Sequence, residues 1–381
     1  MRIVIDRNIP FGEPVFSTLG DVTALRTGDI QAAAVRNADI LIIRSETKVN
    51  AALLDGSPVR FVGTATIGTD HVDTEYLAAH GIGFTSAPGC NANSVAEYIT
   101  AALLTISHQL NLGLAGKTLG IVGVGNIGSK VVRVAQALGM KVLQNDPPLA
   151  RQTGDARFVP LDALMEADII TLHVPLSRTG PDPTYHFFDA TRIGAMHPGS
   201  ILINASRGAV VETAAIRNAL ARKHLAGAVL DVWEKEPAIN AELLSLVNIG
   251  TAHVAGYSLD GKVTAVHMVY QALCRHLDVL PTWTGWDTLP PPGSPRVSLP
   301  VQAGGPEEIL RKTVAHCYDI ELDDRLLREM LAQPEDRRAD YFMKLRTGYR
   351  MRREFSATTI QIPPEQQQIS GTLKALGFPI G

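Results

Sequence analysis

The sequence predicts an α/β fold with parallel β-sheets, divided into more than one domain. Its 381 residues correspond to two to three domains at ~150 residues each. Over the first hundred residues, short β-branched runs alternate with amphipathic stretches, and a second such series begins at Lys117. Strands that alternate with helices are typical of strand–helix–strand units on a parallel sheet. The strand candidates of the first series are Arg2–Ile5, Ile40–Ile43, Arg60–Gly63 and Gly83–Thr85.

A long helix separates the two series. Residues 94–110 are apolar at helical spacing, and the run opens with Asn93 and Ser94, whose side chains are suited to cap a helix. In the second series, helical segments lie between the strand candidates, which predicts a doubly wound sheet. Its strand candidates are Leu119–Val122, a strand that ends at Asp146, Ile169–His173, Ser200–Asn204, Gly227–Asp231 and Asn248–Gly250.

The chain after Tyr257 begins with an apolar helix, Lys262–Leu277. Five prolines then fall within Pro290–Pro300, which excludes a helix interior and predicts a stiff linker. Residues 301–381 form a third unit of mixed helix and strand. Within it, Tyr341–Arg353 carries five basic residues and no acidic one.

Composition limits the possible functions. Hydrophobic residues make up 45% and charged residues 19%, as in globular proteins. The 35 Lys and Arg against 38 Asp and Glu leave a net charge of −3, so no overall positive field favours nucleic acid or an anionic membrane. Cys90, Cys274 and Cys317 are too few and too scattered for a disulfide framework or a zinc site, and we expect no bound metal. No apolar run approaches the ~18 residues of a membrane span, and the N-terminus lacks the features of a signal peptide, so we expect a cytoplasmic protein.

A glycine-rich turn predicts a dinucleotide site. Gly123, Gly125 and Gly128 follow a strand and open a helix, Ile127–Leu138. The first glycine permits a tight turn, the second lets the backbone approach a pyrophosphate, and the third lets helix and strand pack closely. The helix N-terminus offers N–H groups to the phosphates. Asp146, at the end of the next strand, would accept hydrogen bonds from the ribose hydroxyls and repel a 2′-phosphate, which favours NAD over NADP.

Three segments downstream carry candidate catalytic groups. Arg207 follows a buried strand, and such strand ends face the cofactor crevice of a parallel sheet. A guanidinium can bind a carboxylate with two hydrogen bonds and polarise the carbonyl beside it. A hydride leaves an alcohol carbon only when a base takes the hydroxyl proton, and His253 is suited to that task. Glu236 is the candidate partner that fixes the tautomer of His253.

These segments resemble the D-isomer-specific 2-hydroxyacid dehydrogenase family, whose Arg/Glu/His trio matches Arg207, Glu236 and His253. Residues 64–73 (TATIGTDHVD) and 91–98 (NANSVAEY) are similar to the family's substrate-side segments. The resemblance implies a Rossmann-type NAD domain inserted in a flavodoxin-like α/β substrate domain, followed by a C-terminal α+β dimerisation domain. The implied boundaries are 1–95 and 258–289 for the substrate domain, 96–257 for the NAD domain and 290–381 for the dimerisation domain of a homodimer.

Within the family, the chain is most similar to members that oxidise 4-phospho-D-erythronate to 2-oxo-3-hydroxy-4-phosphobutanoate in pyridoxal 5′-phosphate (vitamin B6) biosynthesis. Residues 42–49, 87–92 and 253–258 carry this similarity, together with a C-terminal domain of about ninety residues that includes residues 344–346. By this resemblance, Ser45, Thr66 and Tyr257 would contact substrate. Beside the three glycines, the NAD contacts would be Asn126, Ile127, Asp146, Val174, Ser206, Asp231 and Gly256. Val174 departs from the pattern, because a threonine is expected there.

The substrate's phosphate requires further cationic groups. Arg44, at a strand end, and Arg346, in the basic run, are the candidates. The alternatives are an ion pair of Arg44 with Glu46 and a solvated charged face for the run.

Two other functions remain open. One is 3-phosphoglycerate dehydrogenase or another D-2-hydroxyacid dehydrogenase, with the same chemistry. The C-terminal unit does not match the βαββαβ regulatory module often found in the former. The other is a NAD-sensing binding protein on the same fold, which can retain the trio.

Overall fold

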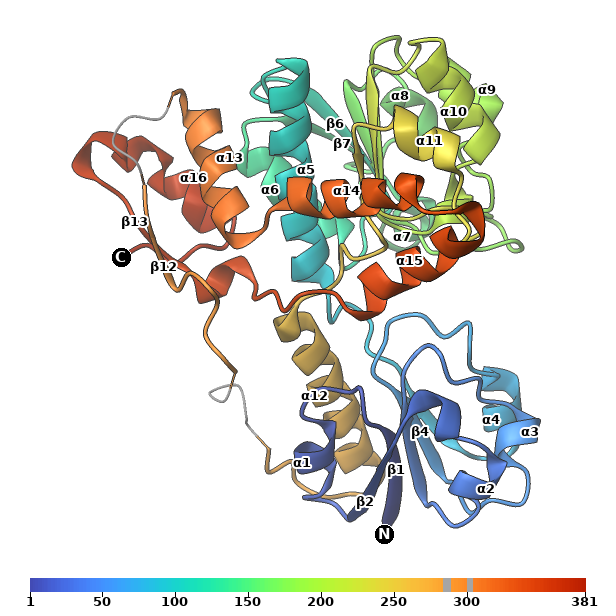
Figure 1. The fold of residues 1–381 in the computed structure, drawn as a ribbon. Coiled ribbons are helices and arrows are strands. Elements are labelled where there is room, and N and C mark those ends of the chain that lie inside the picture. Colours follow the sequence, from blue (N-terminus) through green and yellow to red (C-terminus); the bar gives the residue numbers. More distant parts are fainter. Residues whose placement is uncertain (284–288, 300–303) are drawn as a thin grey trace. The chain divides into compact units, whose positions relative to one another are not determined.

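The protein consists of two compact units, seen here in a computed structural model (Figure 1). The structure describes residues 1–283, 289–299 and 304–381. The first unit comprises Met1–Asn91 and Ser258–Pro290, and the second comprises Ala92–Tyr257 and Pro291–Gly381. Each unit is built on its own parallel sheet.

The sheet of the first unit has the order β2-β1-β3-β4-β5, and all its strand pairs are parallel. This order is that of the flavodoxin-like folds, which confirms the predicted fold class. The strands are β1 (Arg2–Asp6), β2 (Asp21–Leu25), β3 (Ile40–Ile43), β4 (Phe61–Thr64) and β5 (Gly83–Thr85). Strand β2 was not predicted, because at the sheet's edge it is only partly buried and its sequence, DVTAL, has only two β-branched residues.

Helices cover both faces of this sheet. The short helices are α1 (Gly12–Phe16), α2 (Ala32–Val35), α3 (Ala51–Leu54) and α4 (Thr74–Ala79). The long helix α12 (Leu259–His276) packs on β4 and β5 (Figure 1). Alternate residues of β1 point to opposite faces, so Ile3 and Ile5 pack with α12 while Val4 packs with α3.

The sheet of the second unit has the order β11-β10-β9-β8-β6-β7, again entirely parallel. Its strands are β6 (Thr118–Val122), β7 (Lys141–Asn145), β8 (Ile169–Leu172), β9 (Ile201–Asn204), β10 (Gly227–Leu230) and β11 (Ile249–Gly250). The chain leaves β6 for β7 on one side and returns to β8 on the other. A crevice for a ligand forms at such a switch point, outside the carboxyl ends of the strands.

Seven helices of the second unit lie within residues 92–257. They are α5 (Ala92–Leu110), α6 (Gly128–Ala137), α7 (Pro147–Thr153), α8 (Leu161–Leu164), α9 (Ala190–Ala195), α10 (Thr213–Ala221) and α11 (Ala241–Leu246). Hydrophobic clusters lie on both faces of the sheet, one with α5 and α6 and the other with α9, α10 and α11. The doubly wound arrangement that the strand–helix alternation predicts is confirmed.

The C-terminal residues belong to the same compact unit. Helices α13 (Pro306–Cys317) and α14 (Ile320–Arg328) pack against α5 (Figure 1). Strand β12 (Arg296–Ser298) lies inside the stretch expected to be a linker and pairs with β13 (Thr359–Gln361). The sequence did not indicate this pairing. Pro300, the last residue of the expected linker, lies outside the described residues. The remaining helices are α15 (Glu335–Thr347) and α16 (Ser370–Ala375). A separate domain over 290–381 stays a prediction.

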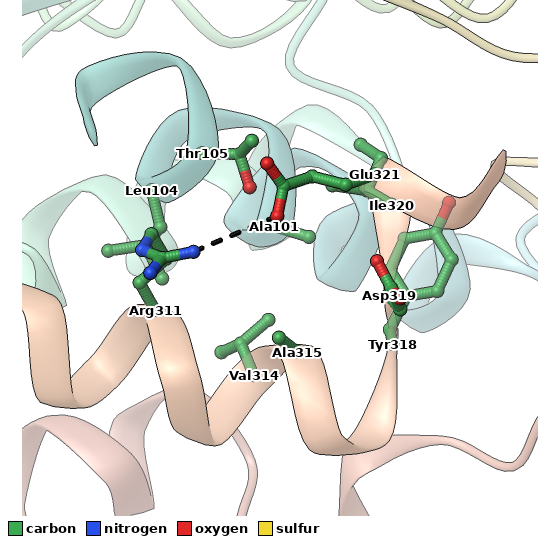
Figure 2. A pocket seen from close by; sticks show the side chains of 10 residues that line it. All are labelled: Ala101, Leu104, Thr105, Arg311, Val314, Ala315, Tyr318, Asp319, Ile320 and Glu321. Atoms are coloured by element: carbon green, nitrogen blue, oxygen red, sulfur yellow. Dashed lines mark ion pairs between the residues drawn. The ribbon is translucent and has the colours of Figure 1, made fainter. Parts of the chain in front are cut away.

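A small pocket of about 10 Å³ lies where α13 and α14 meet α5 (Figure 2). Arg311 and Glu321 face each other across it at 3.8 Å. This volume has room for about one water molecule, which is too small for an organic ligand. None of the described helices is long and apolar enough to cross a membrane.

Candidate active site

The carboxyl ends of the six strands in the second unit lie in one row. Val122 pairs with Asn145 and with Leu172, and the register continues through Asn204 to Leu230 and Gly250. The segments that follow these residues therefore share one edge of the sheet. They contain the glycine-rich turn, Asp146, Val174, Arg207, Asp231 and His253.

The glycine-rich turn has the geometry that a pyrophosphate site needs. Gly123 has φ of +86°, and a Cβ there would lie 2.7 Å from the His173 carbonyl oxygen. A Cβ on Gly128 would lie 2.0 Å from the Gly123 carbonyl oxygen, so helix α6 packs directly on the turn. Nothing lies within 4 Å of the Cβ position of Gly125, where backbone is open to a ligand. These residues fit NAD, whose phosphates would meet the free N–H groups at the start of α6.

Asp146 already has two partners in this turn. One carboxylate oxygen accepts from the Val124 N–H at 2.7 Å, and the other accepts from the Leu149 N–H at 3.0 Å, which caps α7. The carboxylate is thus fixed in place beside the glycine-rich turn. Since a carboxylate oxygen accepts more than one hydrogen bond, it can still receive ribose hydroxyls. Asn126 is exposed and Ile127 is half-buried in the same turn.

Val174 lies at the switch point between β6 and β8. Its Cγ1 would be 2.9 Å from a Cβ on Gly123, so it directly faces the glycine-rich turn. A hydroxyl contact to the cofactor is absent here because valine has none. The neighbouring His173 ring is held at 3.0 Å from the Thr171 hydroxyl, and burial lowers its pKa to about 3. The His173 imidazole is therefore neutral.

Arg207 stands on a turn that is fixed from both sides. Asn204 accepts hydrogen bonds from the N–H and hydroxyl of Ser206 and donates to the Arg207 carbonyl at 3.0 Å. A Cβ on Gly208 would lie only 1.9 Å from the Trp233 carbonyl oxygen, so this glycine lets the two turns touch. The half-buried Arg207 side chain donates to the Ser206 carbonyl at 2.8 Å, its one hydrogen bond among the described residues, which leaves other guanidinium donors for a ligand.

His253 and Glu236 form a hydrogen-bonded pair. The Nδ1 of His253 lies 2.7 Å from Oε2 of Glu236, and Oε1 of Glu236 accepts from the Trp233 N–H at 2.8 Å. The Trp233 indole in turn donates to the Thr251 carbonyl at 2.9 Å, which joins the acidic turn to the histidine turn. Because Nδ1 contacts the carboxylate, Nε2 is the ring nitrogen that can face a substrate.

Asp231 organises the backbone around His253. This buried carboxylate accepts from the Thr251 hydroxyl at 2.6 Å and from the Val254 and Ala255 N–H groups at 2.7 and 3.0 Å. Its main-chain oxygen accepts from the His253 N–H at 2.7 Å. Together these bonds hold His253 in the left-handed region, at φ of +57°. Burial raises the pKa of Asp231, and His253 and the hydrogen bonds oppose that rise.

The first unit brings three predicted substrate residues to one sheet edge. Ile43 of β3 pairs with Thr64 of β4, so Arg44 and Ser45 leave the sheet beside Thr66. Ser45 is exposed, and the Thr66 hydroxyl lies 2.7 Å from that of Thr64. The Arg44 guanidinium lies 3.6 Å from the Glu46 carboxylate, so the ion pair named above as the alternative to phosphate binding is present. Both side chains remain substantially exposed to solvent.

Two arginines of the basic run form ion pairs. Arg350 pairs with Asp323, and Arg352 pairs with Glu97. Arg346, on α15, has a buried Nε without a hydrogen-bond partner among the described residues. Neither ion pair could be expected from the sequence, because the acidic partners lie on α14 and α5.

A second histidine–glutamate pair was also missed. His186 Nε2 lies 2.7 Å from Glu234 Oε1, and Glu234 Oε2 accepts from the Thr213 N–H at 2.7 Å. Two glutamates of one turn thus each hold a histidine. Among the described residues, no three His, Cys, Asp or Glu side chains gather as a metal site.

Comparisons with known proteins agree with this geometry. The family model described as the NAD binding domain of D-isomer specific 2-hydroxyacid dehydrogenases matches residues 100–255. A domain of unknown function, DUF3410, matches residues 288–377. The solved D-lactate dehydrogenase of Aquifex aeolicus, complexed with NAD and lactic acid, is 25% identical over 72% of this chain and 95% of its own, with a TM-score of 0.59. The NAD-dependent formate dehydrogenase of Staphylococcus aureus, complexed with NAD, is 25% identical over 73% of this chain and 96% of its own, also with a TM-score of 0.59.

The curated relatives extend over the entire chain. The erythronate-4-phosphate dehydrogenase of Chromohalobacter salexigens is 45% identical over 100% of this chain and 99% of its own length. That of Edwardsiella ictaluri is 46% identical over 99% of each. The chain therefore belongs to the erythronate-4-phosphate dehydrogenase family, NAD-dependent oxidoreductases within the D-isomer specific 2-hydroxyacid dehydrogenases.

Proposed function

We propose that the protein oxidises C2 of 4-phospho-D-erythronate to 2-oxo-3-hydroxy-4-phosphobutanoate, a step of pyridoxal 5′-phosphate biosynthesis. NAD, when bound, accepts the hydride from C2. The observation that carries the proposal is the 45–46% identity to erythronate-4-phosphate dehydrogenases along the full chain. The solved D-lactate and formate dehydrogenases described above cover 72–73% of it.

The residues of the second unit supply the acid–base chemistry. His253 takes the C2 hydroxyl proton at Nε2 while the C–H bond loses its hydride. The 2.7 Å hydrogen bond that the Nδ1–H of His253 donates to Glu236 holds the ring and favours the imidazolium that forms. Arg207 binds the substrate carboxylate and polarises the developing C2 carbonyl through its remaining donors.

Further residues bind substrate and cofactor in this proposal. Ser45, Thr66 and Tyr257 contact the substrate, and Arg44 and Arg346 are the candidates for its phosphate. Arg346 is supported by the unpartnered Nε, and Arg44 by its exposed ion pair, which a phosphate can replace. The NAD contacts are the glycine-rich turn with Asn126 and Ile127, and beyond it Asp146, Val174, Ser206, Asp231 and Gly256.

The domain division and assembly belong to the same proposal. Residues 1–95 and 258–289 form the substrate domain, 96–257 the NAD domain, and 290–381 a domain through which two copies associate. The separate family match over residues 288–377 supports the last boundary. A cytoplasmic location is supported by the low cysteine content, three in 381 residues, which fits a reducing compartment.

The direct test compares two phosphorylated hydroxy acids. NADH formation is followed with 4-phosphoerythronate and with 3-phosphoglycerate, with a carbonyl trap present because the oxidation is uphill at neutral pH. We expect kcat/KM to favour the four-carbon substrate by at least about 100-fold, since sites with buried polar groups discriminate strongly. A preference for 3-phosphoglycerate would instead identify the protein as a 3-phosphoglycerate dehydrogenase. Activity with neither would favour the NAD-sensing alternative.

A further inference from the structure

The C-terminal segment 349–355 is attached to the loop that carries His253 and Tyr257. Arg352 donates from Nε to the Tyr257 carbonyl oxygen at 3.2 Å. The Tyr349 ring meets the Tyr257 ring edge-on, with centroids 5.8 Å apart. This loop thus receives one backbone contact and one ring contact from a part of the chain nearly a hundred residues further on.

Arg352 is itself held rigidly. It is 5% exposed, and its guanidinium donates to Glu97 Oε2 at 2.5 Å and to the Ser94 carbonyl oxygen at 3.2 Å. It also lies 4.6 Å from the centre of the Tyr318 ring, at the junction of α13 and α14 (Figure 2). A planar guanidinium with several fixed donors can meet all these acceptors at once, whereas an ammonium cannot.

Glu97 depends on this arginine. Burial raises the pKa of the Glu97 carboxyl to about 8, and the Arg352 charge opposes the rise. The other carboxylate oxygen accepts from the Phe355 N–H at 2.6 Å. Next to it, Glu354 accepts from the Ser94 hydroxyl at 3.0 Å and from the Asn93 amide at 3.1 Å. The first turns of α5 therefore fix both sides of Arg352.

Helix α5 reaches the same loop by a second route. The Tyr98 hydroxyl lies 2.9 Å from the Thr251 hydroxyl, which donates to Asp231, the carboxylate that holds the Val254 and Ala255 N–H groups. Arg352 secures the far end of the loop at Tyr257, which Asp231 does not reach by any hydrogen bond in the described residues.

We propose that Arg352 is a positioning residue that, with Tyr349, sets the orientation of Tyr257 and so makes the C-terminal segment part of the substrate site of its own chain. The proposal rests on the proposed function, in which Tyr257 contacts the substrate. Displacement of a substrate contact by about 1 Å lowers kcat/KM by up to about 100-fold.

The test uses Arg352→Lys with Arg328→Lys as its matched control, in the full-length enzyme. Arg328, at the end of α14, also joins the C-terminal part of the chain to carbonyl oxygens within residues 92–257. They are those of Leu244 and Val247, at 2.9 and 2.7 Å, close to β11. Both variants lose a guanidinium fork and keep the charge. We expect both to lower Tm. Only Arg352→Lys should raise KM for 4-phosphoerythronate, by roughly tenfold or more. NADH binding, followed by fluorescence, checks that each variant is folded.

A second readout does not depend on the substrate. Hydrogen–deuterium exchange of the peptide covering residues 251–258 should increase in Arg352→Lys and stay unchanged in Arg328→Lys. Equal KM values and equal exchange in the two variants would overturn the proposal and leave Arg352 a purely structural residue. If the wild-type enzyme is inactive on 4-phosphoerythronate, the proposed function fails, and the exchange result alone decides the inference.

If Arg352→Lys does not fold, Tyr349→Leu replaces it. This variant removes the ring contact with Tyr257 and leaves the Arg352–Glu97 pair intact. It should raise KM in the same direction by a smaller factor, with increased exchange over residues 251–258. Unchanged values of both would contradict the positioning role.

Discussion

Two histidine–glutamate pairs of the second unit share almost the same local geometry. In each, an imidazole nitrogen lies 2.7 Å from a carboxylate oxygen, and each histidine has a positive φ, +57° at His253 and +48° at His186. Each glutamate also accepts one backbone N–H at 2.7–2.8 Å. Both glutamates come from one turn, at positions 234 and 236.

The surroundings of the two pairs differ. Glu236 bonds the N–H of Trp233 in its own turn, and His253 follows β11 in the row of strand ends that also contains Arg207. Glu234 instead bonds Thr213, at the start of α10, and so ties the turn to another element. The His186 ring stacks on the Tyr185 ring, with centroids 4.0 Å apart. The backbone N–H of His186 donates to the Ala209 carbonyl.

The comparison teaches that a paired imidazole is not by itself a catalytic base. What separates His253 is its place at the carboxyl edge of the sheet, in the same row of strand ends as the arginine turn and the glycine-rich turn. His186 has an equally close carboxylate, but its contacts hold a connection between β8 and α9. We therefore expect the first pair to act in the reaction and the second to stabilise the fold.

The largest difference should come from the histidines. His253→Asn removes the base that takes the hydroxyl proton, so kcat should fall by on the order of 10²–10⁴-fold. NADH binding should remain, because the glycine-rich turn is unchanged. The matched variant His186→Asn should keep kcat within about threefold of the wild-type value, since we expect His186 to transfer no proton in the reaction. Steady-state NADH formation measures both; similar losses in the two variants would refute the distinction.

A smaller effect should follow from the glutamates. Glu236→Gln keeps a hydrogen-bonding side chain beside His253 but removes its charge, so kcat should fall by about 10–100-fold, as for other partners that orient a functional imidazole. Glu234→Gln, the control from the same turn, should leave kcat nearly unchanged. If Glu234→Gln lowered kcat as much as Glu236→Gln, both pairs would have to be assigned to the reaction.

The smallest effect concerns stability and pH. Burial favours the neutral form of Glu234, but the hydrogen bonds from Thr213 and His186 outweigh it, so the pKa of Glu234 lies below its ordinary value. Ionised Glu234 therefore stabilises the fold above its ordinary pKa, and this contribution disappears as pH falls through the lowered one. Glu234→Gln should reduce Tm at pH 7 by about 2–4 °C. The difference from wild type should shrink at pH 4; a difference that grew on acidification would contradict this sign.

Periodicity and turn chemistry located most elements correctly. Residues 40–43 and 83–85 are strands with the predicted bounds, and α5 begins only two residues before the predicted helix. The missed strands lack a local signal for two different reasons. Strand β2 is only partly buried, whereas β12 and β13 are stabilised mainly by pairing with each other across more than sixty residues of sequence. No local pattern reports such a pairing.

The fold class, the dinucleotide turn and the resemblance of the trio to the family could be inferred from the amino-acid sequence, because each depends on residues close together in the chain or on a spacing with a fixed geometric meaning. The tertiary structure was needed to show which arginines of the basic run form ion pairs and that the Glu234 carboxylate holds another histidine. It also decided that Arg352 reaches Tyr257. Those contacts join segments from dozens to more than two hundred residues apart, and the charge of a side chain does not indicate which distant group folding will bring to it.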